Sequence, residues 1–181
     1  MIKSIYLTAV LSLIPFSLWA SNEVDNRPMP LDRIEVLLGR WYEIARFNHS
    51  FEKGQDNVMA FYSRKADGTL TVTNSGWKSG KMKTANGKIK LTSTPGRLRV
   101  SFFWPFYSDY RVLMMAGDNS YALIGGSSGK YLWILSRTPE MTQRAKNRVL
   151  REAATRGYSV SDLIWVDQRY NINGAQVSEK K

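Results

Sequence analysis

Apolar and polar residues alternate with a period of two through most of the central chain. The alternating segments are separated by glycine, asparagine, aspartate or proline. Alternation of this kind between turn residues is typical of strands that bury one face. It predicts eight strands, at 40–48, 57–64, 69–76, 86–93, 97–104, 109–116, 120–125 and 130–137.

The connections between these strands are short. Turns are predicted at 66–68, 85–87, 94–96, 117–119 and 125–129, with 86–87 alone as an alternative turn before the fourth strand. Eight regularly spaced strands with short connections favour an up-and-down antiparallel barrel over a Greek-key sandwich. A barrel of this size can hold one small ligand. The expected fold class is therefore all-β, with an eight-stranded up-and-down antiparallel barrel.

The periodicity becomes helical after Pro139. Thr142 or Thr138 is expected to cap one C-terminal α-helix packed on the barrel, and Gly157 to end it. The apolar stripe of this helix consists of Ala145, Val149, Leu150 and Ala153. The opposite face is basic and carries Arg144, Lys146, Arg148, Arg151 and Arg156. A last short strand is predicted at 163–166.

Two runs of residues carry a family resemblance. The first strand opens with Gly39-Arg40-Trp41-Tyr42-Glu43-Ile44-Ala45-Arg46-Phe47, and the last ends with Trp133-Ile134-Leu135-Ser136-Arg137-Thr138-Pro139. Both resemble the lipocalins, most closely the bacterial outer-membrane type and apolipoprotein D. The family's Thr-Asp-Tyr turn is degraded here to Gly117-Asp118-Asn119. The resemblance covers roughly Leu31 to Asp167, and it implies a ligand-binding barrel with a short helical segment at 31–38 across its closed end.

The N-terminus resembles a secretory signal peptide. Within residues 1–20, Lys3 precedes an apolar run and Ala20 offers a small residue at the cleavage point. An exported protein is therefore expected. It is either periplasmic, with association with the outer membrane as one possibility, or secreted. The other boundaries are a flexible N-terminal segment at 21–30, a lipocalin domain at 31–170 and a disordered tail at 171–181.

Strand directions predict which residues meet at each end of the barrel. Strand eight ends where strand one begins, so Trp41 and Arg137 are expected to meet at the closed end. A guanidinium over an indole contributes about 0.5–2 kcal/mol, and we interpret this pair as structural. The connections at the open end carry or adjoin aromatic residues, which predict a cavity mouth at Phe51, Trp77, Trp104, Phe106 and Tyr107. Packing of these connections on one another is the alternative.

Strand parity assigns one face of each strand to the interior. The two-residue period places Glu43 and Ala45 on this face, and Arg46 on the other. Small residues on this face leave room for a ligand instead of filling the barrel. The predicted cavity lining is Glu43, Ala45, Val58, Ala60, Tyr62, Leu70, Val72, Asn74, Leu98, Val100, Phe102, Tyr110, Val112, Met114, Trp133 and Leu135.

Polar residues in this lining are candidates for contact with a ligand. Tyr62, Asn74 or Tyr110 is expected to hydrogen-bond its polar group. Glu43 needs a partner or a proton, because an isolated buried carboxylate is costly. The favoured interpretation is that Glu43 bonds to tyrosine, indole or backbone groups; the alternative is a functional carboxylate that repels anionic heads or binds a cationic one.

Composition excludes several classes of function. The chain has no cysteine, so it lacks disulfides, thiolate metal sites, a cysteine nucleophile and an N-terminal cysteine for lipid attachment. His49 is the only histidine, and no nucleophile elbow, phosphate loop or paired-histidine motif is present. We therefore expect no catalytic residues, no metal site and no cofactor. The net charge of +11 is interpreted as a solubilising charge, with an anionic membrane surface as the alternative partner, whereas an exported chain without a basic block is not expected to bind nucleic acid.

These observations predict an exported carrier, monomeric or homodimeric, that binds small hydrophobic ligands in the barrel. Fatty acids or lysophospholipids are the expected ligands, and envelope lipid handling, storage or transport the expected role. One alternative is a membrane-surface interaction protein that uses the aromatic connections and the basic helix. Another is a lipocalin that binds haem, through His49, or a different cofactor.

Overall fold

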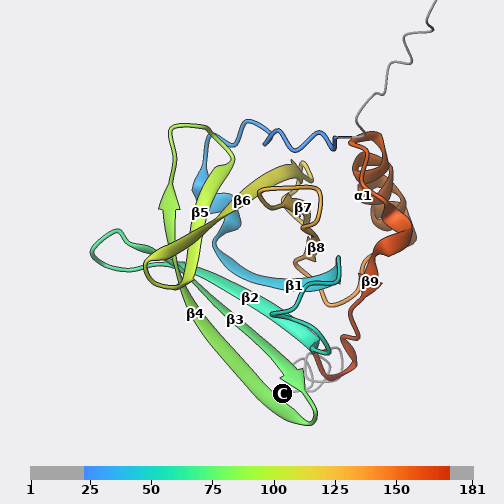
Figure 1. Cartoon of the computed structure of the whole chain (residues 1–181), viewed down its shortest axis with the longest axis horizontal. Coiled ribbons are helices and arrows are strands. Elements are labelled where there is room, and N and C mark those ends of the chain that lie inside the picture. The colour runs from blue at the N-terminus through green and yellow to red at the C-terminus, as the bar shows by residue number, and fades with distance from the viewer. Residues whose placement is uncertain (1–22, 172–181) are drawn as a thin grey trace, which may run out of the picture.

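A computed structural model describes residues 23–171 and consists of a closed antiparallel barrel with one long helix on its outside (Figure 1). The sheet order is β2-β3-β4-β5-β6-β7-β8-β1-β9, and pairing of β1 with β2 closes eight strands into the barrel. This confirms the predicted eight-stranded barrel and C-terminal helix. The strands are β1 Gly39–Arg46, β2 Asp56–Arg64, β3 Leu70–Lys78, β4 Lys81–Leu91, β5 Arg97–Phe103, β6 Phe106–Met115, β7 Tyr121–Gly125, β8 Leu132–Ser136 and β9 Ile164–Trp165.

The predicted turn at 85–87 is wrong, because Asn86 and Gly87 lie inside β4. The β3–β4 hairpin turns instead at Ser79 and Gly80, which have φ values of 51° and 72°. Two successive positive φ angles match the right-handed twist of the flanking strands. Gly87 serves a different purpose, since an added Cβ would lie 3.0 Å from the Phe102 ring. The connection between β5 and β6 is likewise shorter than predicted, because Phe103 already pairs with Phe106.

Two β-bulges change which side chains face inward. The pairing of β1 with β8 shifts between Glu43 and Ala45, and that of β6 with β7 shifts between Val112 and Met114. An extra residue in one strand reverses the alternation beyond it. Ala45 and Met114 consequently pack on the outside of the barrel, which corrects their predicted place in the lining. Arg46 turns inward for the same reason.

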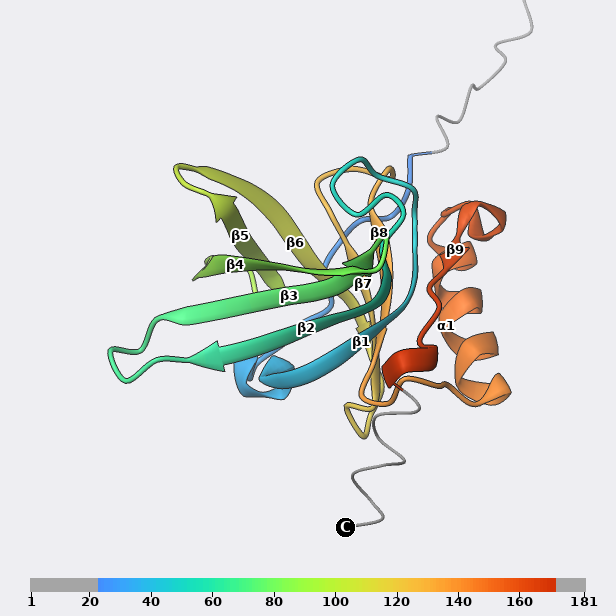
Figure 2. The same ribbon diagram turned by 90° about the horizontal axis from the view of Figure 1, so that it is seen from below.

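The closed end is built as the resemblance implies. The 3-10 helix η1, Ile34–Leu37, precedes β1 (blue in Figure 2). Trp41 Nε1 donates a hydrogen bond of 2.7 Å to the Leu37 carbonyl. The Arg137 guanidinium lies 3.7 Å from the centre of the Trp41 ring and donates to the Val36 and Arg40 carbonyls, each at 2.7 Å. Trp41 and Arg137 therefore meet, and together they fix η1 to the barrel.

Helix α1, Gln143–Thr155, covers one side of the outer wall (Figure 1). The Thr142 hydroxyl accepts a hydrogen bond from the Ala145 amide, and Gly157 follows the helix with a φ of 86°. The apolar side of α1 contributes to an outer cluster of buried residues: Tyr42, Ile44, Ala45, Phe47, Leu113, Ala116, Tyr121, Leu123, Leu132, Ile134, Met141, Val149, Ala153, Tyr158 and Leu163. Strand β9 pairs with β1 beside this helix.

The segment before η1 is held against the barrel, where the sequence predicts flexibility. The Asp25 and Met29 amides donate to the Arg156 and Val112 carbonyls, each at 2.8 Å. Asn26 bonds to Gly126 and accepts from the Tyr158 hydroxyl. The predicted signal peptide and nearly all of the predicted tail lie outside the described residues. Between residues 23 and 171, none of the helices has the length and apolar character needed to cross a bilayer.

Candidate ligand-binding site

The barrel interior contains a cluster of buried apolar residues, here called the inner cluster. It consists of Leu37, Trp41, Ala60, Tyr62, Leu70, Val72, Ile89, Leu98, Val100, Val112, Ala122, Ile124 and Leu135. Eight of the sixteen predicted lining residues belong to it, and Phe102, Tyr110 and Trp133 pack against it while partly buried. Val58 is buried beside the inner face of β3, where an added Cβ at Gly76 would lie 2.9 Å from Val58 Cγ2.

Several members of this cluster were not predicted from the sequence. Ala122 and Ile124 lie in β7, whose five residues are all buried, so apolar side chains occupy both faces and give no alternation to follow. Ile89 lies within the predicted strand 86–93, but no residue of that strand was assigned to the lining. Met115 faces inward in place of Met114 because of the β6 bulge.

The inner face of β3 and β4 is buried near the closed end and becomes accessible to solvent at Asn74 and Ala85, although Gly76, further along β3, is covered by Val58 and Gln55. The register between these strands is uninterrupted, so Leu70 and Ile89, Val72 and Gly87, and Asn74 and Ala85 share the inner face. The first four residues are buried, Asn74 is half-buried and Ala85 is exposed. The change occurs where β4 loses its partner, because pairing with β5 ends at Lys88 and Ser101. This accessible inner face is the candidate site.

Polar groups adjoin this face. The Oδ1 atom of Asn74 is shielded from solvent and has no hydrogen-bond partner among the described residues. The hydroxyls of Tyr62 and Tyr110 are 2.9 Å apart and bond to each other. Burial raises the pKa of both phenols above their ordinary value, so both stay protonated. A ligand's polar group could therefore donate a hydrogen bond to the Asn74 amide oxygen. The tyrosine pair could accept hydrogen bonds and could donate one, because one of its two hydroxyl protons is used between the rings.

Glu43 is paired with Arg46, which the two-residue period assigns to the outer face. Arg46 Nη1 donates to Glu43 Oε1 at 2.7 Å, and both side chains are buried. The second guanidinium nitrogen of Arg46 donates to the Glu52 and Gln55 carbonyls at 2.9 and 3.0 Å. Burial raises the pKa of the Glu43 carboxyl to about 8; the charge of Glu52 adds to the rise and Arg46 opposes it. The expected partners of Glu43, namely tyrosine, indole or backbone groups, are thus replaced by Arg46.

The connection between β1 and β2 is anchored by a second buried carboxylate. Trp133 Nε1 donates to Glu52 Oε2 at 3.0 Å, and His49 Nε2 lies 3.0 Å from the same oxygen. The His49 ring stacks on Phe51 with 4.0 Å between centroids. Sequence pattern gave no signal for Arg46 or Glu52, because the bulge in β1 brings them together. These contacts hold the connection in place at the open end.

The predicted mouth residues fall into two groups. Phe51, Trp104 and Phe106 are exposed, and Phe103, which was not predicted, is exposed beside Trp104 and Phe106. Trp77 stacks on Tyr170, with centroids 5.5 Å apart, and the Tyr107 ring lies 4.5 Å beneath Lys90 Nζ.

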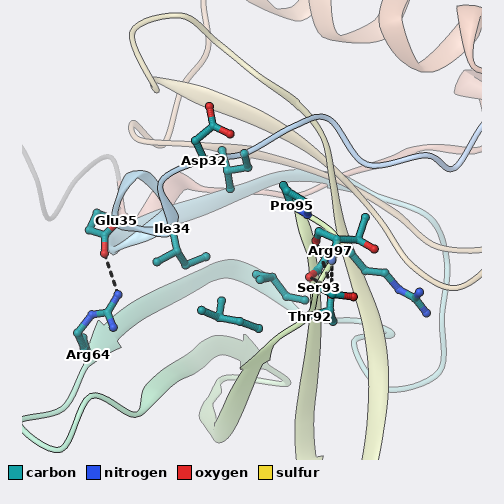
Figure 3. Close-up of a pocket in the computed structure, with 13 residues that line it drawn as sticks. Asp32, Ile34, Glu35, Arg64, Thr92, Ser93, Pro95 and Arg97 are labelled. Carbon is teal, nitrogen blue, oxygen red and sulfur yellow. Dashed lines mark hydrogen bonds and ion pairs between the residues drawn. The ribbon is translucent and has the colours of Figure 1, made fainter.

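A separate hollow of about 500 Å³ lies at the closed end, between η1 and the β4–β5 turn (Figure 3). Leu31, Ile34 and Leu91 contribute apolar surface to it, and Arg97 lies on the turn side. The ion pair of Glu35 with Arg64, at 2.8 Å, borders it on the other side. None of its residues except Leu98 belongs to the predicted lining, so this hollow is distinct from the candidate site.

Comparison with known proteins agrees with the fold. The family model described as a lipocalin-like domain matches residues 31–168. The chain is 45% identical over 135 residues to the outer membrane lipoprotein Blc of Escherichia coli K12, which covers 72% of this chain and 76% of that protein. It is 29% identical over 146 residues to mouse apolipoprotein D, covering 75% and 76%.

A solved structure shows the same architecture at low sequence identity. The cockroach allergen Per a 4 superimposes with a TM-score of 0.68 at 20% identity, covering 84% of this chain and 99% of that one. At this identity the likeness concerns the fold alone.

Proposed function

Since this chain belongs to the lipocalin family, we propose that it is an exported carrier that binds fatty acids or lysophospholipids inside the barrel. The observation that carries the proposal is the inner face of β3 and β4, which is apolar and buried towards the closed end but solvent-accessible at Asn74 and Ala85. An elongated amphiphile fits this gradient, with its tail towards the inner cluster and its polar end towards the mouth.

The apolar part of the site supports useful affinity. Burial of one methylene contributes ~0.8 kcal/mol, so about ten would contribute ~8 kcal/mol before the cost of ordering the chain. A net free energy of that size would correspond to a dissociation constant of about 1 μM, which is therefore the limit that burial of ten methylenes sets before the ordering cost is subtracted. The polar groups then serve mainly to orient the ligand.

An anionic polar end is favoured by the rim of the site. Lys83 pairs with Gly76 and lies two residues from Ala85 in an uninterrupted register, so it occupies an inner-face position. Its side chain is exposed. A carboxylate or phosphate at the mouth would meet this ammonium group, whereas the deeper carboxylate of Glu43 is already paired with Arg46.

The proposed role is envelope lipid handling, storage or transport. The relative Blc is named an outer membrane lipoprotein, which supports export of this chain, and we propose a periplasmic or secreted protein. The 181 residues contain no cysteine, so we propose residence without lipid attachment through an N-terminal cysteine. We further propose binding without catalysis or haem, because His49 is buried between Glu52 and Phe51.

Substitution of Ala85 by tryptophan tests the ligand site. The new indole would fill the accessible inner face, and the affinity for a fluorescent fatty acid is expected to fall at least about tenfold, since the lost burial is worth more than 1.4 kcal/mol. Titration of the fluorescence measures this affinity. Thr84→Trp is the matched control, because Thr84 is the neighbouring residue on the outer face and is also exposed. Equal binding by Ala85→Trp and the unmodified protein would refute the proposed site.

A further inference from the structure

The open end of the barrel carries one sign of exposed charge. Exposed lysines occupy or adjoin three of its four connections, namely Lys53 after β1, Lys78, Lys81 and Lys83 around the β3–β4 turn, and Lys130 before β8. Among the described residues of these connections the one acid, Glu52, is buried, and Asp56 at the start of β2 is half-buried. The closed end differs, because exposed acids such as Glu35, Asp67 and Asp118 mix there with Arg33 and Lys65.

The β5–β6 hairpin adds a concentrated apolar surface to the same end. Phe103, Trp104 and Phe106 are 79%, 77% and 77% exposed; these three residues are here called the aromatic tip. Figure 2 shows this hairpin and the β1–β2 connection projecting towards the same side, opposite the β6–β7 turn. Phe51, on the β1–β2 connection, is 57% exposed. Large apolar side chains gathered at one end of a molecule mark an interaction surface.

We propose that the open end docks on an anionic phospholipid bilayer, with the aromatic tip in the interface and the lysines against the head groups. Aromatic rings are favoured at the level of the head groups, where their apolar bodies leave water. Lysines near an anionic leaflet contribute about 1 kcal/mol each. An anionic bilayer offers an apolar interface for the aromatic rings and negative head groups for the lysines over one broad face. An acidic protein surface would complement the lysines alone.

The basic helix is the other candidate for this contact, and its packing argues against it. Arg144, Arg148 and Arg151 are exposed on α1. The apolar side of the helix, including Val149 and Ala153, is buried against the barrel in the outer cluster. A helix that binds in the membrane interface must insert an apolar face. The apolar face of α1 is already buried against the barrel.

Docking in this orientation turns the accessible inner face of the barrel towards the lipid. Exchange of an amphiphile between membrane and barrel then needs no passage through water, a consequence that rests on the proposed carrier function. The docking itself does not, because the aromatic tip and the lysines lie outside the candidate site. Loss of ligand binding in the Ala85→Trp variant would leave vesicle binding intact.

Vesicle flotation of the full chain tests the proposal. The vesicles are phosphatidylcholine alone or phosphatidylcholine mixed with phosphatidylglycerol, at low and high salt. The unmodified protein is expected to float with the mixed vesicles and to dissociate partly at high salt. The triple variant Phe103→Ser, Trp104→Ser, Phe106→Ser is expected to bind on the order of a hundredfold more weakly, since each ring contributes interfacial burial. Phe61→Ser is the matched control, because Phe61 is an exposed aromatic on the outer face of β2.

Charge variants separate the open end from the helix. The variant Lys53→Gln, Lys78→Gln, Lys130→Gln is expected to lose about fivefold in binding for each lysine, and to lose most of the salt dependence. The variant Arg144→Gln, Arg148→Gln, Arg151→Gln is expected to stay within about twofold of the unmodified protein, since long-range attraction alone is lost. Residues 1–20 are common to all variants, so differences report on the substituted positions.

Three results would overturn the proposal. The aromatic-tip variant could float as well as the unmodified protein, or the helix variant could lose binding while the lysine variant keeps it. Equal flotation with and without phosphatidylglycerol would also exclude an anionic surface as the partner. Circular dichroism of each variant confirms that the barrel is folded, which its exposed positions lead us to expect.

Discussion

The Arg46 guanidinium lies in the barrel wall, where it contacts the Glu43 carboxyl and holds the β1–β2 connection. Its guanidinium makes one ion pair of 2.7 Å and two hydrogen bonds to carbonyls, all in a buried setting. Breaking a buried ion pair on one side leaves an uncompensated charge and costs more than the pair itself contributes. This residue therefore connects the stability of the barrel with the placement of the open end.

Above the pKa of about 8 at which Glu43 ionises in the folded protein, the variant Arg46→Met is expected to lower the free energy of unfolding by about 3–5 kcal/mol. Chemical denaturation followed by circular dichroism measures the change. Arg64→Met is the matched control: Arg64 forms an ion pair of similar length with Glu35, but both side chains are substantially exposed. Its cost is expected to stay below about 1 kcal/mol. Similar losses for the two variants would contradict the buried role of Arg46.

The raised pKa of Glu43 predicts a pH dependence with a definite sign. The carboxyl titrates near 4.5 in the unfolded chain and near 8 in the folded protein, because burial disfavours the charged form. The folded state thus holds the proton more tightly, and ionisation of Glu43 costs stability as the pH rises between these two values. Below about 4.5 this cost is absent.

The variant Glu43→Gln removes this titration. Its stability relative to the unmodified protein is expected to improve steadily as the pH rises from about 4.5 to about 8. Denaturation curves at several pH values in this window measure the difference. A difference that moves in the opposite direction would mean that the pairing with Arg46 outweighs burial and lowers the pKa.

At the scale of elements, strand β4 decides how the barrel opens. Nine of its eleven residues, Lys81 to Ile89, pair with β3 without interruption, but only Lys88 to Leu91 pair with β5. The unpaired length follows from the tight Ser79-Gly80 turn, which starts β4 early and carries it beyond the reach of the shorter β5. Lysines on this free edge discourage edge-to-edge association with other sheets.

The β3–β4 turn offers a direct test of this arrangement. Gly80 has a φ of 72°, a conformation that costs about 1–2 kcal/mol for a residue with a Cβ. Gly80→Ala is therefore expected to lower the free energy of unfolding by about 1 kcal/mol or slightly more. Gly117→Ala is the control, because Gly117 also lies in a turn but has no positive φ and no atom near its added Cβ. Equal effects of the two substitutions would contradict the turn at 79–80.

For the whole molecule, the barrel has two unlike ends. Trp41 and Arg137 bind η1 across one end, while the other end combines an accessible inner face, exposed lysines and the aromatic tip. The proposals of ligand binding and of membrane docking both place function at the open end. The contacts of Trp41 and Arg137 stabilise the closed end.

Much of this organisation follows from the sequence alone. The period of two predicted eight strands, the change to helical spacing after Pro139 predicted α1, and the count of strand directions predicted that Trp41 and Arg137 meet. These features depend only on the local periodicity of each segment and on the order of the strands along the chain, and both can be read from the sequence. Where the alternation runs unbroken, the predicted lining residues lie in the barrel interior, as Leu70 and Val72 of β3 do.

The tertiary structure alone decided the features that depend on a single inserted residue or on where pairing stops. One extra residue at the β1 bulge moved Ala45 outward and Arg46 inward, and so chose the partner of Glu43. The bulge at β6 exchanged Met114 for Met115, and Gly87 met Phe102 instead of forming a turn. The physical reason is that alternation is a property of one strand, whereas bulges and strand ends are set by the partner strand, which lies far away in the chain.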